Sequence, residues 1–141
     1  MRYFGGTVCD STVKGWKAEG RRQVIGQAEL VAVPVALCTW EELLTQRDVL
    51  VFVDNDAAKA CLVRGISMAR DSDKIANEAR LLSAEIGAAC WYERVPSPSN
   101  PADGPSRKYL GWLKARGFSP SAMKLKPWLS LLVQVKDFWA V

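Results

Sequence analysis

A run of five apolar residues, Val49-Leu50-Val51-Phe52-Val53, limits the possible folds of this chain more than any other segment. Continuous Val, Leu and Phe side chains are typical of a β-strand that is covered on both faces, as strands of parallel sheets are. The polar residues Asp54-Asn55-Asp56 follow directly, and each can cap a helix predicted over 57–63, which Gly65 ends. A buried strand that passes at once into a helix indicates an α/β fold.

Strands and helices alternate through most of the remaining chain. A helix is predicted over 27–46, where apolar residues recur at the three-to-four spacing of one buried face, and Pro34 inside it predicts a kink or a loosened turn. This alternation predicts helices that cover a largely parallel or mixed sheet. The other predicted elements are strands over 3–8, 23–25 and 90–95, and helices over 11–18, 74–89 and 101–116.

The length of 141 residues corresponds to one domain that can bury a sizeable core. We assign residues 1–117 to this domain and 118–141 to an apolar C-terminal tail of unknown role. No run of 18 apolar residues occurs, so no membrane span and no membrane partner are expected. The N-terminus also lacks the hydrophobic stretch of a signal peptide, and we therefore expect an intracellular protein.

The absence of histidine removes several kinds of chemistry. Ser/His and Cys/His catalysis and any His-ligated zinc site are excluded. The four cysteines are widely spaced and form no CxxC pair, so neither a redox motif nor a disulfide framework is indicated. Any hydrolytic chemistry must therefore depend on carboxylates, and we expect metal ions to act with them.

Three carboxylates stand at the ends of predicted elements. Glu29 opens a helix, Asp54 ends the apolar strand, and Asp103 lies in the first turn of the helix that begins at Asn100-Pro101-Ala102. Each acid also has a simpler explanation: Asp54 as a helix cap, and Glu29 and Asp103 as first-turn acids favoured by the helix dipole. Taken together, three such acids can hold divalent cations against a phosphodiester.

The order of these motifs resembles a known family. Glu29-Leu30, Val53-Asp54-Asn55 and the run Asn100-Pro101-Ala102-Asp103-Gly104-Pro105-Ser106-Arg107 are similar to ribonuclease H-like domains, in particular those attached to retroelement reverse transcriptases. The resemblance covers roughly residues 23–110, and its most specific part is the run 100–107. It implies a mixed sheet flanked by helices and cleavage of the RNA strand of an RNA–DNA hybrid.

The resemblance also assigns roles to residues. Glu29 matches the family's helix-borne glutamate, Asp54 the aspartate that ends the fourth strand, and Asp103 the aspartate of the last helix. In the family, such acids are catalytic and bind two divalent ions, usually Mg²⁺ and alternatively Mn²⁺. The expected partners are an RNA–DNA hybrid and a reverse transcriptase domain. We predict nucleic-acid contacts at Asn55, Lys59, Arg64 and Arg107.

One part of the family pattern is missing. The family's first, central strand carries an aspartate well before the helix glutamate, whereas only 28 residues precede Glu29 here. Asp10 lies in a polar stretch and is a poor substitute, and Asp137 in the apolar tail is a remote one. We therefore expect a chain truncated at its N-terminus, without the central strand and the first metal ligand, and a weakened or inactive site.

Two other functions fit the same residues. One is a non-catalytic nucleic-acid-binding or structural remnant of the fold, and the other is an integrase-like or exonuclease-like metal nuclease. The net charge of +4 is only mildly basic, so the Lys and Arg residues indicate either phosphate contacts or a solvated face. Trp91 and Tyr92 are candidates for stacking on bases, although their place in a strand favours at least partial burial.

Overall fold

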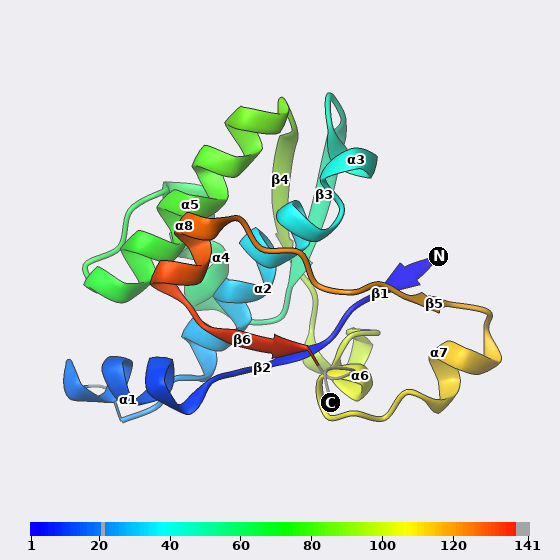
Figure 1. Ribbon diagram of the computed structural model, residues 1–141, viewed down its shortest axis with the longest axis horizontal. Helices are drawn as coiled ribbons and strands as arrows, with labels where there is room; N and C mark the ends of the chain where they lie inside the picture. Colours follow the sequence, from blue (N-terminus) through cyan, green and yellow to red (C-terminus); the bar gives the residue numbers. More distant parts are fainter. Residues whose placement is uncertain (21, 138–141) are drawn as a thin grey trace.

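The computed structural model describes residues 1–20 and 22–137 and has a mixed α/β architecture (Figure 1). At its centre, helix α2 (Ile25–Thr39) packs along helix α5 (Arg70–Ile86), and α5 also contacts β4 (Ala89–Arg94), which pairs with β3 (Asp48–Val53). The buried core is shared by these four elements and by α4 (Asp56–Arg64). The predicted α/β class is therefore confirmed.

Helix α5 follows the prediction closely. One stripe of this helix, Ile75, Ala79, Leu82 and Ile86, is buried throughout, and Ile75 and Ala79 have no exposed surface. The helix begins four residues earlier than predicted and ends at Gly87, whose φ of 66° closes the last turn in the left-handed conformation. A single apolar stripe at helical spacing is enough to fix this element.

Helix α2 is shorter than predicted, because the predicted helix 27–46 is divided in two. The division falls at Trp40, after which α3 (Glu41–Leu44) forms a separate turn. No break occurs at Pro34, which is buried inside a continuous helix. Pro34 has no N–H to donate, so it costs α2 one hydrogen bond without ending it. The strand predicted over 23–25 is wrong: Ile25 begins the helix.

Strands β3 and β4 pair in parallel and in register, with Leu50 opposite Trp91 and Val53 opposite Arg94. The prediction that β3 is covered on both faces is wrong. Its side chains alternate between the core and solvent, and Leu50 and Phe52 are 59% and 57% exposed. Helices α4 and α5 contact this pair, whereas the row that holds Leu50 and Phe52 stays accessible.

The two ends of the described chain meet in small sheets. The predicted strand 3–8 is divided into β1 (Arg2–Tyr3) and β2 (Gly6–Val8), which is followed by α1 (Asp10–Ala18). The C-terminal segment pairs with both strands: β5 (Ser119–Pro120) lies parallel to β1, and β6 (Val135–Asp137) lies antiparallel to β2. Between them, α8 (Pro127–Leu132) contacts α5.

The strands thus form three separate two-stranded sheets within the described residues, in place of one sheet. Within residues 118–137 the tail does not take the place of a central strand beside β3, because β6 pairs with β2. Asp137 instead accepts a hydrogen bond from the Met123 amide at 2.9 Å. Residues 138–141, the end of the predicted tail, lie outside the described part of the chain.

The long helix predicted over 101–116 is wrong. A 3-10 turn, η1 (Ser97–Ser99), leads to α6 (Asp103–Ser106), and α7 (Gly111–Ala115) follows as a second short helix. Lys108 between them has a φ of 66°, which a right-handed helix cannot contain. Gly104 and Pro105 also weaken helix formation here. Across the described residues, no helix is long and apolar enough to cross a membrane.

Candidate carboxylate site

Glu29 and Asp54 come together, although 24 residues separate them in the sequence. Glu29 lies in the first turns of α2, whose N-terminus is joined to α5 by a hydrogen bond from Gln27 Nε2 to Ser72 Oγ (3.2 Å). Asp54 follows the last residue of β3, where the Val53 carbonyl accepts a hydrogen bond from the Val95 amide at 2.9 Å. Both acids are therefore carried by elements fixed in the core.

The pairing of these two acids changes the chemistry of Glu29. Burial of the side chain raises the pKa of the Glu29 carboxyl, and the neighbouring Asp54 carboxylate raises it further by repulsion. A hydrogen bond with the Asn55 side chain opposes this shift. Glu29 Oε2 is buried and has no hydrogen-bond partner among the residues described. An orphaned carboxylate oxygen beside a second carboxylate is a place where a proton or a cation is stabilised.

Asn100 connects the third motif to this pair. Its Nδ2 donates to Asp54 Oδ2 at 2.9 Å, while its Oδ1 accepts from the Ala102 amide at 3.0 Å. Its carbonyl accepts from the Asp103 amide at 3.1 Å. One side chain thus holds the Asp54 carboxylate and the start of the segment that carries Asp103. The sequence indicates only a place at a helix start for Asn100, and nothing local in it points to Asp54.

The side chain of Asp103 does not join the other two acids. Its Oδ1 pairs with Arg107 Nη2 at 3.3 Å, one turn further along α6, and 40% of the Asp103 side chain is exposed. Within residues 1–20 and 22–137, no group of three or more acidic, Cys or His side chains could hold a metal ion. The structure therefore brings two of the three predicted ligands together and pairs the third with Arg107.

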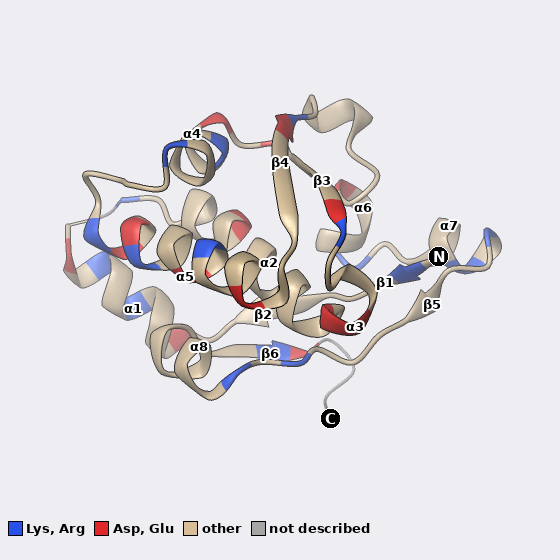
Figure 2. Cartoon of the chain, turned by 90° about the horizontal axis from the view of Figure 1, so that it is seen from above, with Lys and Arg blue, Asp and Glu red and all other residues tan. Residues whose placement is uncertain are grey.

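The predicted nucleic-acid contacts have mixed surroundings. Asn55 caps α4, accepting from the Ala58 amide at 2.9 Å, and also contacts Glu29. Lys59 forms an ion pair with Glu93. Arg64 lies exposed in the last turn of α4. Both positively and negatively charged residues occur along α1, α4 and α5 (Figure 2), so none of these helices carries positive charge alone.

An apolar surface lies on the open face of the β3–β4 pair. Leu50 and Phe52 of β3 and Trp91 of β4 share this face, and Trp91 is 68% exposed. The expectation that Trp91 is at least partly buried is wrong. Tyr92 points to the other side, where burial raises the pKa of its hydroxyl to about 12. Exposed aromatic side chains grouped in this way mark a surface that a partner can cover.

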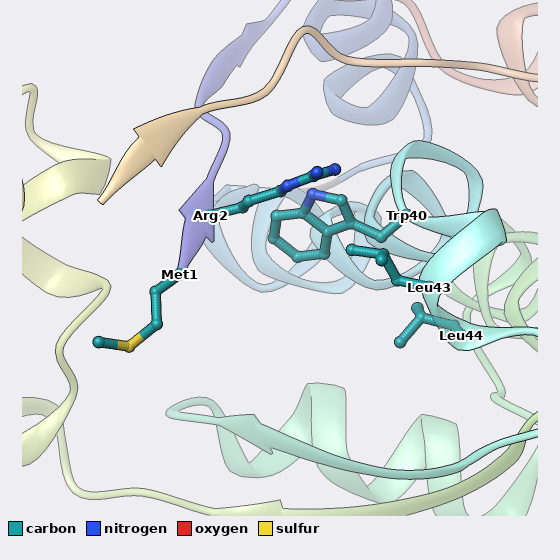
Figure 3. A pocket seen from close by; sticks show the side chains of 5 residues that line it. All are labelled: Met1, Arg2, Trp40, Leu43 and Leu44. Carbon is teal, nitrogen blue, oxygen red and sulfur yellow. The ribbon is translucent and has the colours of Figure 1, made fainter. Parts of the chain in front are cut away.

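A hollow lies elsewhere in the described part of the chain, lined by other residues than the paired acids. It is a shallow pocket of about 380 Å³ in which the Arg2 side chain extends beside the Trp40 indole (Figure 3). The ring of Trp40 also packs edge-on against Phe4, with centroids 5.0 Å apart, and its Nε1 donates to Ser121 Oγ. No carboxylate lines this pocket, so it is not a candidate cation site. Its lining residues are Met1, Arg2, Trp40, Leu43 and Leu44.

Comparison of the chain with protein-family models, curated proteins and solved structures found no match. The assignment of a function consequently depends on the chain's own residues and their geometry.

Proposed function

We propose that this chain is a ribonuclease H-like domain whose site binds divalent cations and acts on the RNA strand of an RNA–DNA hybrid. The observation that carries the proposal is the convergence of three motifs: Glu29 meets Asp54, and Asn100 of the third motif donates to Asp54. Residues far apart in the sequence thus meet at the C-terminal end of β3, the edge where α/β sheets commonly bind ligands.

The two paired acids fit a hard divalent cation. Mg²⁺ and Mn²⁺ prefer oxygen ligands, and the orphaned Glu29 Oε2 beside Asp54 offers a concentration of negative charge that such an ion neutralises. Glu29 and Asp54 would hold the ion, with Asp103 as the further ligand that the motif suggests. When bound, the ion supplies an activated water and charge stabilisation at the phosphate.

The remaining side chains have supporting roles in this proposal. Asn100 fixes the orientation of the Asp54 carboxylate, and Asn55 does the same for Glu29. Arg64 and Arg107 are exposed cations that can contact phosphates, whereas Lys59 must first leave Glu93. A reverse transcriptase domain is the polypeptide partner that we propose on the basis of the motif resemblance.

A second candidate is a non-catalytic binding module of the same fold. It is favoured by the pairing of Asp103 with Arg107, which leaves two carboxylates at the site, and by the exposed face of Leu50, Phe52 and Trp91. Such a module would bind nucleic acid or a partner domain without cleaving a phosphodiester. An integrase-like or exonuclease-like nuclease is a third candidate, which differs from the first in its substrate.

The deciding experiment measures cleavage of a labelled RNA–DNA hybrid with Mg²⁺ or Mn²⁺, beside single-stranded RNA and duplex DNA. We expect cleavage of the hybrid alone and its complete loss in Asp54→Asn. The matched control is Asp56→Asn, which makes the same change two residues away in an exposed ion pair with Arg94 and should cleave like the wild type.

Each outcome distinguishes the candidates. Hybrid binding without cleavage by the folded wild-type chain supports the binding module. Preferential cleavage of duplex DNA supports the third candidate. Equal cleavage by the wild type and Asp54→Asn would overturn the assignment of the carboxylate site itself.

A further inference from the structure

We propose that Arg107 is a latch on the cation site, which nucleic-acid phosphate opens by drawing Arg107 away from Asp103. This inference rests on the proposed function and adds a regulatory step to it. The latch makes the third carboxylate available only when substrate is present. Cation binding and nucleic-acid binding then reinforce each other through one arginine.

The first support is the position of Asp103. Its amide donates to the Asn100 carbonyl at 3.1 Å, and the Asn100 side chain donates to Asp54 Oδ2 at 2.9 Å. Two hydrogen bonds therefore connect the backbone of Asp103 to the carboxylate pair. The Asp103 carboxylate nevertheless faces Arg107. Bringing it to the pair requires a side-chain rearrangement, with the Asn100 contacts kept in place.

The second support is the weakness of the contact that must break. The Asp103–Arg107 pair spans 3.3 Å within one turn, with 40% and 69% of the two side chains exposed. Ion pairs of this kind contribute little, because water and salt screen them. A phosphate is a stronger partner for Arg107, since it offers a guanidinium two parallel charge-assisted hydrogen bonds. Competition between phosphate and Asp103 for Arg107 consequently favours phosphate.

The third support is the local backbone. Helix α6 is only four residues long, and Lys108 directly after Arg107 has a left-handed φ of 66°. Arg107 therefore stands at the end of a short helical turn, where a change of its side chain displaces no core packing. In contrast, Glu29 and Asp54 belong to elements anchored in the core. The latch is thus placed on the side of the site that can rearrange.

The test measures Mn²⁺ affinity of the full chain by calorimetry, without nucleic acid. We expect Arg107→Gln to bind Mn²⁺ up to about fivefold more tightly than the wild type, as removal of an exposed ion pair allows. Arg64→Gln removes the same charge from the end of α4 and controls for the general loss of positive charge. Arg107→Lys keeps the charge and should stay close to the wild type. In an Asp103→Asn background, the gain from Arg107→Gln should disappear.

A second measurement tests the coupling. An RNA–DNA hybrid with a 2′-O-methylated RNA strand, which resists cleavage, should raise the Mn²⁺ affinity of the wild type. The same hybrid should raise it much less in Arg107→Gln, because the latch is already open, and Arg107→Gln should bind the hybrid more weakly. Thermodynamic linkage requires Mn²⁺ to strengthen hybrid binding by the same factor.

The outcomes separate this inference from the proposed function. Mn²⁺ binding by the wild type that Asp54→Asn abolishes, together with equal affinities of Arg107→Gln and Arg64→Gln, would retain the cation site and overturn the latch. A wild-type chain that binds no Mn²⁺ in either condition would overturn both. Tighter Mn²⁺ binding in Arg107→Gln but not in Arg64→Gln, measured without nucleic acid, supports the latch, because general electrostatics would act equally in the two variants.

Discussion

The two sides of the candidate site are built very differently. Glu29 and Asp54 are held by α2 and β3, which share a continuous buried core with α5. Asn100, Asp103 and Arg107 are held by residues 97–117, where the helices have four and five residues and Leu113 is the buried apolar side chain. Packing fixes the first side, whereas individual hydrogen bonds hold the second. The difference indicates that the paired acids are preorganised and the third acid is not.

The largest loss of stability should come from a substitution on the packed side. Ile75 on α5 has no exposed surface, so Ile75→Ala leaves a cavity and should lower the free energy of unfolding by about 2–5 kcal/mol. Tyr109, between α6 and α7, is 70% exposed, and Tyr109→Ala should change it by less than about 0.5 kcal/mol. Urea denaturation of both variants measures the difference between their free energies of unfolding. Similar losses from the two substitutions would show that the second side is packed as firmly as the first.

A smaller loss of stability is expected at Asn100, where the two sides of the site meet. Asn100→Ala removes the donor to Asp54 and the acceptor for the Ala102 amide, which should cost about 1–3 kcal/mol. Ser99→Ala, an exposed neighbour, controls for a change in the turn. Asn100→Asp keeps the acceptor and places a second carboxylate against Asp54, so it should recover stability in acid. Denaturation at pH 7 and pH 4 checks this, and a loss in Asn100→Ala no greater than in Ser99→Ala would remove Asn100 from the site.

The comparison also shows which features the sequence could predict. Helix α4 is marked by a capping residue and by Gly65, and α5 by a four-residue stripe, so both were predicted within a few residues. The 101–116 segment carries a good helix start, yet Gly104 and Pro105 follow it, and tertiary packing does not compensate for them. Local patterns therefore predicted the elements that packing also supports and failed where packing is sparse.

The site follows the same rule. The meeting of Glu29 and Asp54 agrees with their positions at element ends, and the Asp103–Arg107 pair agrees with its spacing of four along a helix. The Asn100–Asp54 hydrogen bond joins residues 46 positions apart, and no local pattern contains it. The exposure of β3 was also unpredictable from its composition, since a run of Val, Leu and Phe does not reveal how many layers cover it.

The smallest predicted effect concerns the pair of acids itself. The raised pKa of Glu29 means that the folded state holds this proton more tightly than the unfolded chain does. The stabilisation is complete below the unfolded pKa, about 4.3, and is lost as the pH rises through the folded value. Glu29→Gln should therefore be more stable than the wild type at pH 7, and the difference should shrink towards pH 4. The gain should be modest, because Glu29 is only half-buried and water screens the repulsion.

The same substitution in an Asp54→Asn background isolates the cause. If repulsion from Asp54 contributes to the shift, Glu29→Gln should stabilise the Asp54→Asn chain less than it stabilises the wild type, as a double-mutant cycle at pH 7 would show. If burial alone causes the shift, Glu29→Gln should stabilise the wild type and the Asp54→Asn chain equally. Saturating Mg²⁺ offers an independent comparison, because a cation between the two carboxylates would remove the repulsion and stabilise the wild type more than Glu29→Gln. Equal thermal shifts in the two chains would show that no ion binds between the two carboxylates.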